Sequence, residues 1–385
     1  MRIAFYAPLK SPTHGTPSGD RRVAGLLMQA LARAGHRVEL VSTFRSYDGT
    51  GDGIRQAALR EQGIALGRRL AAQWRAGPET ARPDLWFSYH VYYKAPDWLG
   101  PEASSVLGIP YVIAEASHAA KRAGGPWDPG HRGTADAIRR ADLLLCPTRD
   151  DLEGLRTLTG APDRVASLPP FLDVAPYREA AGARDEHRAR LVRAHGLDPS
   201  LPWIAVAAMM RRGDKLASYR LLAGTLRRLR DTGWRLVVAG DGPARAEIES
   251  VLGSAVPGRT TFLGALTVTE VAALYAAADL CVWPAVNEAY GMAMLEAQAA
   301  GVPVVSCAGR GVPDVVEHGR TGLLAPTGDE PALAGLVREL LYDPGERTRL
   351  SECAAAFVAA ERSLESAAAI LARLLARFGA VAGVN

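Results

Sequence analysis

Residues 279–308 read DLCVWPAVNEAYGMAMLEAQAAGVPVVSCA, and they hold two short apolar runs on either side of a segment with a helical period. The first run ends at Pro284, the helical segment is Met292–Ala299, and the second run begins at Val302. Strands that alternate with helices are typical of a parallel sheet that helices cover on both faces. This stretch therefore predicts one βαβ unit of an α/β fold.

The same alternation runs through the rest of the chain and is interrupted at a proline-rich segment that begins at Ser167. Strands are expected near residues 2–8, 36–42, 84–91, 109–116 and 141–148, and again near 202–210, 234–242, 260–265, 279–285 and 302–308. We therefore predict an α/β protein with two Rossmann-like, doubly wound domains, 1–172 and 173–361. A C-terminal helix at about 362–385 has the apolar period to pack back onto the first domain.

The composition is that of a soluble globular protein, with 48% hydrophobic and 22% charged residues in 385. A formal net charge of +4 gives no reason to expect nucleic acid as a partner. Cys146, Cys281 and Cys307 lie in apolar runs, so we expect reduced core thiols and a cytoplasmic protein, monomeric or homodimeric. No apolar run reaches the roughly 20 residues of a membrane span, and the first residues fit a strand better than a signal peptide.

Two glutamates, Glu288 and Glu296, stand on either side of a Tyr-Gly turn in an otherwise small and apolar stretch. A helix that starts just after this turn offers backbone N–H groups to a phosphate. Glu296 then lies about 8 Å further along the helix axis than Glu288, so one ligand of nucleotide size can meet both carboxylates. A helix-capping Glu288 and a solvated Glu296 are the simpler alternative, but the neighbours of Glu296 look buried, which favours a paired role.

Two further loops join a strand to a helix, where open α/β sheets bind their ligands. Residues 11–22, SPTHGTPSGDRR, carry Gly15 and Gly19, and residues 239–249, AGDGPARAEIE, carry Gly240 and Gly242 around Asp241. Neither loop has the G-x-G-x-x-G spacing of a dinucleotide site. A mobile loop and a tight turn explain them equally well.

Residues 276–328 closely resemble the retaining family-4 glycosyltransferases. The likeness includes the E-x7-E pair Glu288 and Glu296, the segment 301–304 (GVPV) and the run 315–324. AGDGP at 239–243 matches the family's G-[DE]-G-P, and the likeness extends over essentially the whole chain. The resemblance implies the GT-B fold, in which two Rossmann-like domains face a cleft and the second holds most of the donor nucleotide.

By this resemblance Glu296 would bind the ribose hydroxyls and Glu288 a hydroxyl of the donor sugar. The N–H groups at the start of the helix would hold the diphosphate. Without ligand, both carboxylates need water or a basic neighbour. The implied donor-binding set is Gly19, Arg211, Lys215, Gly240, Gly264, Glu288, Ala289, Tyr290, Gly291, Met292 and Glu296.

The resemblance also implies cations at the diphosphate, from the loop after the second domain's first strand. Lys215 matches the lysine of the family's G-R-x-x-x-x-K, but Met210 stands in place of its arginine. The arginine contact with the diphosphate is therefore expected from Arg211 or, as the alternative, from Arg212. His118 matches a histidine that the family keeps near the donor sugar. Gly19 matches the glycine at the diphosphate, and Asp20 and Arg21 follow it. The expected catalytic residues are His118, Glu288, Lys215 and Arg211.

The expected reaction is transfer with retention of the anomeric configuration, from a UDP-sugar or, second, a GDP-sugar. No Asp-x-Asp motif occurs in the chain. Lys215, Arg211 and a helix N-terminus can offset the charge of the leaving diphosphate, so we expect neither metal nor cofactor. Three alternatives stay open: a nucleotide-sugar epimerase of the same fold, an NAD-dependent oxidoreductase, and a non-catalytic sugar-binding module.

The acceptor is not identified by the sequence, but residues 86–98, WFSYHVYYKAPDW, are unusually aromatic and form a candidate acceptor region. The candidate contacts are Tyr89, His90, Tyr92, Tyr93, Lys94 and Trp98. A packed strand edge is the alternative interpretation. The arginine-rich helix expected at 54–75 is a candidate for peripheral contact with anionic lipid, although a solvated basic face is the commoner explanation.

Overall fold

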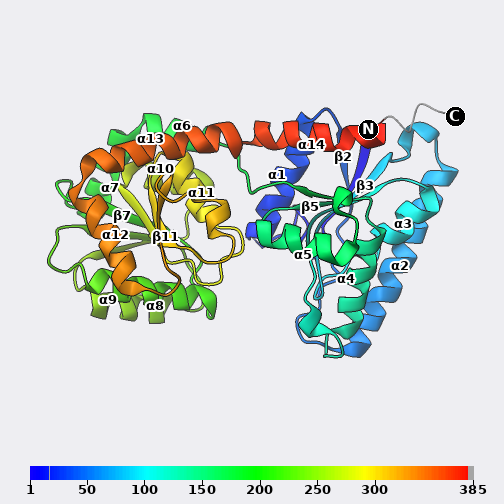
Figure 1. The fold of residues 1–385 in the computed structure, drawn as a ribbon, viewed down its shortest axis with the longest axis horizontal. Coiled ribbons are helices and arrows are strands. Elements are labelled where there is room, and N and C mark those ends of the chain that lie inside the picture. Colours follow the sequence, from blue (N-terminus) through cyan, green and yellow to red (C-terminus); the bar gives the residue numbers. More distant parts are fainter. Residues whose placement is uncertain (17, 380–385) are drawn as a thin grey trace. The chain divides into compact units, whose positions relative to one another are not determined.

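The computed structural model describes residues 1–16 and 18–379, and the chain divides into two compact units. The first unit is Met1–Pro169 together with the chain from Leu364 onward, and the second is Pro170–Ser363. Each unit contains a six-stranded sheet in which every strand pair is parallel (Figure 1). The predicted α/β class with two Rossmann-like units is therefore confirmed.

The first sheet has the strand order β2-β1-β3-β4-β5-β6, so the direction of winding reverses between β1 and β3. Its strands are β1 Arg2–Tyr6, β2 Arg37–Ser42, β3 Leu85–Tyr92, β4 Tyr111–Ser117, β5 Leu143–Cys146 and β6 Val165–Ser167. Its helices are α1 Gly19–Arg33, α2 Gly53–Ala76, α3 Gly100–Leu107, α4 Asp128–Arg140, α5 Arg149–Thr159 and α14 Leu364–Gly379, with short 3-10 turns at Glu79–Ala81, Ala120–Arg122 and Pro162–Arg164. The last helix, α14, packs against α1, where Glu365 forms an ion pair with Arg33.

The second sheet has the order β12-β11-β10-β7-β8-β9, which reverses between β7 and β10. Its strands are β7 Trp203–Ala207, β8 Arg235–Ala239, β9 Thr260–Gly264, β10 Leu280–Trp283, β11 Val304–Cys307 and β12 Gly322–Ala325. Its helices are α6 Ala175–Gly182, α7 Arg184–His195, α8 Asp214–Arg227, α9 Arg245–Ala255, α10 Val268–Ala277, α11 Met292–Ala299, α12 Glu330–Tyr342 and α13 Pro344–Glu361, with a 3-10 turn at Val312–Asp314.

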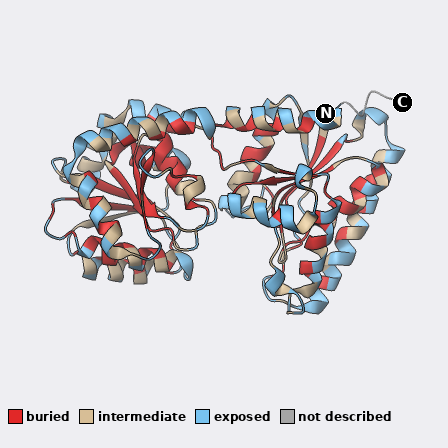
Figure 2. Ribbon diagram, in the orientation of Figure 1, coloured by how far each residue is buried: buried red, intermediate tan, exposed pale blue. Residues whose placement is uncertain are grey.

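The strands form the centre of each unit because helices cover both faces of each sheet. β5, β10 and β11 are buried at every position, as their unbroken apolar sequences require, and Figure 2 shows the buried sheets enclosed by half-exposed helices. Cys146, Cys281 and Cys307 are buried free thiols within these three strands, as predicted. Within the described residues, no helix combines the length and the apolar character that crossing a membrane requires.

Some helix boundaries differ from the sequence prediction. The apolar helical period of the sequence begins at Arg21, but helix α1 begins at Gly19, because Ser18 caps it and accepts a hydrogen bond from the Arg21 N–H. The sequence predicts a helix over 218–232, but α8 begins at Asp214 and ends at Arg227. Lys215 therefore belongs to the first turn of α8 and not to the preceding loop. Strands β6 and β12 are absent from the predicted set. Residues 380–385 of the expected C-terminal helix, and Pro17 of the expected glycine-rich loop, lie outside the described residues.

Gly240 and Gly242 fix the turn after β8 against the loop after β7. Their φ angles are +144° and +150°, a region that only glycine enters readily. A Cβ atom at Gly240 would lie 2.0 Å from the Ala208 carbonyl oxygen, and one at Gly242 would lie 2.5 Å from that of Met210. Close packing of two backbones therefore requires glycine at both positions, whatever else this turn binds.

We predict that Gly240→Ala destabilises the second unit by about 3 kcal/mol or more, because it adds both a steric clash and a strained φ. Chemical denaturation followed by circular dichroism measures this. The matched control is Gly253→Ala in the exposed part of α9, where a Cβ meets nothing, and which should stabilise by roughly 0.5–1 kcal/mol. Equal effects of the two substitutions would contradict the close packing.

Candidate functional site

All strands of a parallel sheet end at the same edge, and loops separate where the strand order reverses, which leaves room for a ligand. In the second unit this reversal lies between β7 and β10. The loop after β10 and the first turn of α8, which follows β7, meet there. Val286 donates its N–H to the Ser218 hydroxyl at 3.0 Å, and the Asn287 side-chain amide donates to Asp214 Oδ1 at 3.0 Å.

The backbone of the loop after β10 is strained. Ala285 and Asn287 have φ angles of +57° and +51°, and Gly291, just before α11, has +70°. Non-glycine residues in this region cost on the order of 1–3 kcal/mol each and persist where the surroundings fix them, most often at functional sites. Buried Gln298 joins α11 to the segment after β11, since its side-chain amide donates to the Val315 carbonyl at 2.8 Å.

Glu288 and Lys215 form an ion pair at this place, across the reversal of strand order. Both side chains are partly exposed, so a ligand can reach them. The Lys215 ammonium also lies 5.5 Å from the ring centroid of Trp283, which packs edge-to-face on Tyr219. The ion pair provides the basic neighbour that Glu288 needs without a ligand.

Glu296 lies on α11, beyond its start at Met292, and only 7% of it is exposed. Burial is the main cause that raises the pKa of Cys281 to about 12, and the carboxylate of Glu296 raises it further against a hydrogen bond with Tyr275. Helix α11 begins without a side-chain cap, since Gly291 occupies the N-cap position. Its first N–H groups therefore have no capping side chain, next to exposed Ala289 and half-buried Tyr290.

The remaining expected donor contacts of the second unit lie on neighbouring loops. Gly240 donates its N–H to the Gly264 carbonyl at 2.7 Å. Met210 is fully buried and donates its N–H to the Asp241 carbonyl, so it anchors the loop in the core. Arg211 and Arg212 follow it, both exposed, and neither forms an ion pair within residues 1–16 and 18–379.

In the first unit the reversal between β1 and β3 holds a second charged cluster. His90 Nδ1 lies 2.9 Å from Asp20 Oδ1, and His90 Nε2 lies 3.5 Å from Glu115 Oε1. Asp20 belongs to the first turn of α1, next to Gly19, whereas His90 and Glu115 belong to β3 and β4. Burial alone would lower the pKa of His90, but the carboxylates of Glu115 and Asp20 outweigh it and raise this pKa.

Aromatic residues at the end of β3, together with Tyr93 directly after it, form a row of ring contacts. Tyr89 contacts His90, His90 contacts Tyr92, and Tyr92 contacts Tyr93, with ring centroids 5.0 to 5.8 Å apart. Tyr93 continues the row to Trp127, 5.9 Å away, and the cations of Lys94 and Arg122 both lie over these last two rings.

Trp98 lies apart from this row. A Cβ atom on Gly63 of α2 or on Gly133 of α4 would collide with its side chain, so Trp98 packs between these helices. Three arginines of the basic helix α2 also have partners: Arg55 and Arg68 face the carboxylates of Asp48 and Glu102, and Arg60 lies over the Trp98 ring.

His118 follows β4 directly, at the carboxyl edge of the first sheet, and its ring lies 4.7 Å from that of His131. Burial, followed by the charges of His131 and Arg139, lowers the pKa of His118, so its imidazole is neutral at pH 7. A neutral imidazole can both accept and donate a hydrogen bond, which suits a group that binds sugar hydroxyls.

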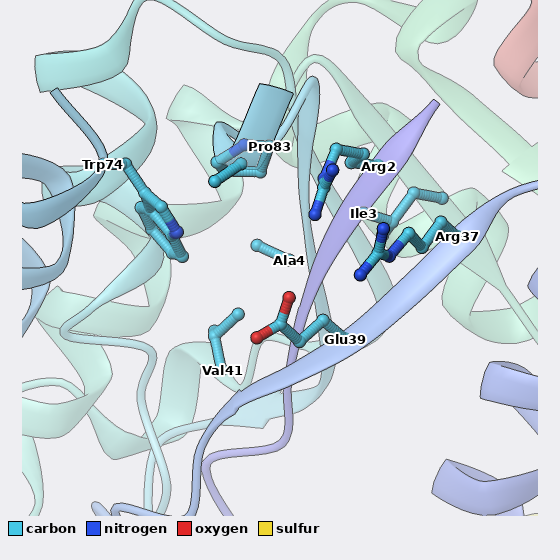
Figure 3. A pocket seen from close by; sticks show the side chains of 9 residues that line it. Arg2, Ile3, Ala4, Arg37, Glu39, Val41, Trp74 and Pro83 are labelled. Atoms are coloured by element: carbon cyan, nitrogen blue, oxygen red, sulfur yellow. The ribbon is translucent and has the colours of Figure 1, made fainter. Parts of the chain in front are cut away.

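A pocket at the opposite edge of the first sheet is a poor candidate for the chemistry. Figure 3 shows it between the starts of β1 and β2, where Arg2, Arg37 and Glu39 surround it with Trp74 of α2. Ligands of open α/β sheets bind at the other ends of the strands. In the described part of the chain, no three His, Cys, Asp or Glu side chains are grouped to hold a metal ion.

Comparison with known proteins agrees with this geometry. Residues 203–343 match the family described as glycosyl transferases group 1, and residues 18–171 match the glycosyl transferase 4-like domain. The D-inositol 3-phosphate glycosyltransferase of Xylanimonas cellulosilytica is 30% identical over 96% of this chain and 94% of its own. That of Pseudarthrobacter chlorophenolicus is 27% identical over 91% and 88%. The chain is a family-4 glycosyltransferase.

Solved structures show that this glycosyltransferase has the GT-B fold. Sucrose-phosphate synthase from Thermosynechococcus elongatus superposes with a TM-score of 0.70 at 20% identity, and the alignment covers 99% of both chains. Anabaena HepE, in complex with UDP, superposes with a TM-score of 0.74 at 16% identity over 98% of this chain and all of HepE. At these identities the likeness establishes the fold alone.

Three residues of the glycosyltransferase that sequence reasoning did not select lie in these clusters. Glu115 pairs with His90, and Arg122 and Trp127 complete the cationic end of the aromatic row. Glu115 is opposite His90 only through the register of β3 and β4, and Trp127 meets Tyr93 only through the packing of α4. No local pattern marks any of the three.

Proposed function

We propose that this glycosyltransferase moves a sugar from a nucleoside diphosphate, UDP in preference to GDP, to a hydroxyl-bearing acceptor. It does so with retention of the anomeric configuration and without a metal. The ion pair of Lys215 and Glu288 carries the proposal, because it puts a cation and a carboxylate together at the reversal of strand order. When the donor binds, each member of this ion pair gains a new partner. The diphosphate binds Lys215, and a sugar hydroxyl donates to Glu288.

The other roles follow the family resemblance. Glu296 binds the ribose hydroxyls from its nearly buried position on α11, and the uncapped start of this helix binds the diphosphate. Arg211, exposed and without an ion pair in the described chain, adds a second cation. His118 lies near the transferred sugar. The preference for UDP is supported by HepE, which has been solved with UDP and with UDP-glucose.

As the acceptor we propose a phosphorylated polyol. Relatives over nearly the whole chain are named for transfer to D-inositol 3-phosphate. Lys94 and Arg122 provide cations that stack on Tyr93 and Trp127, and neither forms an ion pair with the described carboxylates. The cation–π contacts hold the Lys94 ammonium and the Arg122 guanidinium in fixed positions. Two fixed cations bind an anion better than flexible surface side chains do.

The first prediction of the proposal concerns donor binding. UDP at a hundredfold its dissociation constant should stabilise the protein by about 2.7 kcal/mol and raise its Tm by roughly 5–10 °C. Glu296→Ala should abolish most of this shift, because it removes the carboxylate that meets the ribose. Differential scanning fluorimetry with UDP, GDP, ADP and NAD measures it, and Glu352→Ala on the exposed face of α13 is the control. A shift with NAD alone would overturn the donor assignment.

The second prediction concerns the metal. Transfer from a UDP-sugar should continue at its full rate in excess EDTA, because Lys215 and the start of α11 offset the charge on the leaving diphosphate. Lys215→Ala should lower kcat by about a hundredfold, the usual effect of losing one preorganised donor. Arg193→Ala on exposed α7 is the control. Loss of activity in EDTA that Mg²⁺ or Mn²⁺ restores would disprove metal independence.

The third prediction concerns the acceptor, and the same assay compares an inositol phosphate with unphosphorylated inositol. We expect the phosphorylated acceptor to be preferred at least tenfold in kcat/KM, as for a charge-assisted contact. Lys94→Ala should remove much of this preference and leave the KM for the donor unchanged. Equal use of the two acceptors would exclude a phosphate site, and sugar conversion without any acceptor would indicate an epimerase.

A further inference from the structure

The loop after β10, which carries Glu288, needs support from outside itself. Ala285 and Asn287 have φ angles of +57° and +51°, and residues that are not glycine keep such angles only where their surroundings fix them. Helix α8 supplies this support, because side chains of its first two turns contact the loop. The position of Glu288 therefore depends on α8 as well as on its own loop.

The hydroxyl of Ser218 makes the most buried of these contacts. Ser218 is 1% exposed, and its hydroxyl donates to the Asp214 carbonyl at 2.8 Å and accepts the Val286 N–H at 3.0 Å. One hydroxyl thus joins the backbone of α8 to the backbone of the loop, two residues before Glu288. Without it the Val286 N–H loses its partner, and the loop must move to satisfy this group.

Helix formation does not explain a serine at this position. Alanine has the higher helix propensity, and a bond from a serine or threonine hydroxyl to the carbonyl four residues earlier slightly destabilises a helix. Thr225, two turns further along α8, makes a bond of this kind to the Leu221 carbonyl at 2.9 Å. Ser218 differs from it because the Ser218 oxygen also accepts an N–H of the loop.

The first turn of α8 contacts the same loop on the side of Glu288. The Asn287 side-chain amide donates to Asp214 Oδ1 at 3.0 Å, and the next residue of the loop, Glu288, pairs with Lys215, the next residue of the helix. Two neighbours on the helix therefore contact two neighbours on the loop. Together with the Ser218 contact, they fix the loop on α8 in one register.

We propose that Ser218 is a positioning residue of this glycosyltransferase: its buried hydroxyl fixes the loop after β10 on α8, so that the carboxylate of Glu288 lies beside the ammonium of Lys215. Asp214 supports the same loop through Asn287. All of these residues belong to the second unit. The inference rests on the proposed function, in which Glu288 binds a hydroxyl of the donor sugar, and Ser218 acts through Glu288 without touching the substrates.

The start of α11 has separate support, so the loss of the Ser218 hydroxyl should affect the sugar and not the nucleotide. A Cβ atom on Gly291 would lie 2.8 Å from Val315 Cγ2, which shows how closely the turn before α11 packs there. Gln298 of α11 donates to the Val315 carbonyl as well. Glu296 and the first N–H groups of α11, which the proposed function assigns to the nucleotide, therefore keep their places in a Ser218 variant.

The experiment measures by calorimetry the Kd of UDP and of three UDP-sugars: UDP-glucose, UDP-galactose and UDP-N-acetylglucosamine. The readout is the Kd of the UDP-sugar that the wild type binds most tightly, divided by the Kd of UDP. The variants are Ser218→Ala, Glu288→Gln and their combination. Thr225→Val removes a second buried hydroxyl from α8 at nearly equal volume, so it is the matched control and should keep both constants.

We expect Ser218→Ala to raise this ratio by about tenfold, as for the loss of one charge-assisted hydrogen bond, and to change the Kd of UDP by less than about twofold. Glu288→Gln should raise the ratio by a similar factor. The combined variant should show no larger ratio than Glu288→Gln alone, because both substitutions remove the same contact with the sugar.

A swap of the exposed pair Asp214 and Asn287 tests the same loop without altering the core, and it decides the matter if Ser218→Ala does not fold. Asn287→Asp places two carboxylates opposite each other and should raise the ratio at least threefold. Adding Asp214→Asn restores a pair of amide and carboxylate, which should return the ratio to within about twofold of the wild type. Aspartate tolerates a positive φ nearly as well as asparagine, so the backbone at residue 287 is kept.

Three results would overturn the inference while the proposed function stands. Ser218→Ala leaves the ratio unchanged or weakens UDP and the UDP-sugar equally, its effect adds to that of Glu288→Gln, or the swapped pair does not restore the ratio. In these cases Ser218 only supports the fold. If no UDP-sugar binds to the wild type, or if Glu288→Gln leaves the ratio unchanged, the proposed function itself fails and the inference fails with it.

Discussion

An all-parallel sheet ends all of its strands at one edge, and the candidate site depends on this constraint. Because the strand order reverses once in each sheet, two loops separate at that edge and leave a place that the sheet does not fill. In the second unit Lys215 and Glu288 meet across this reversal, and in the first unit Asp20 and His90 do. The same topology thus places a carboxylate beside a cation twice.

Backbone strain is concentrated at the same edges. Among the described residues, five that are not glycine have positive φ: His90, Glu115, Ala285, Asn287 and Arg310. All of them lie in the later part of β3 or β4, or in the loops after β10 and β11. Each costs on the order of 1–3 kcal/mol, and the buried strands behind them supply the rigidity that maintains it.

The two charged clusters satisfy their carboxylates differently. Glu288 pairs with the flexible side chain of Lys215. In the proposed function the ammonium of Lys215 turns to the diphosphate, and the carboxylate of Glu288 then binds a sugar hydroxyl. Asp20 lies beside His90, whose other ring nitrogen faces Glu115.

The sequence by itself determined the α/β class, the two units and the βαβ unit around α11, because strands and helices depend on residues close in the chain. It left helix starts uncertain by two to four residues, since caps such as Ser18 act through a single hydrogen bond. Only the tertiary structure decided that Lys215 pairs with Glu288, that Trp98 packs between helices, and that Glu115 supports His90. These contacts join residues far apart in the chain through strand order and register, which no local pattern records.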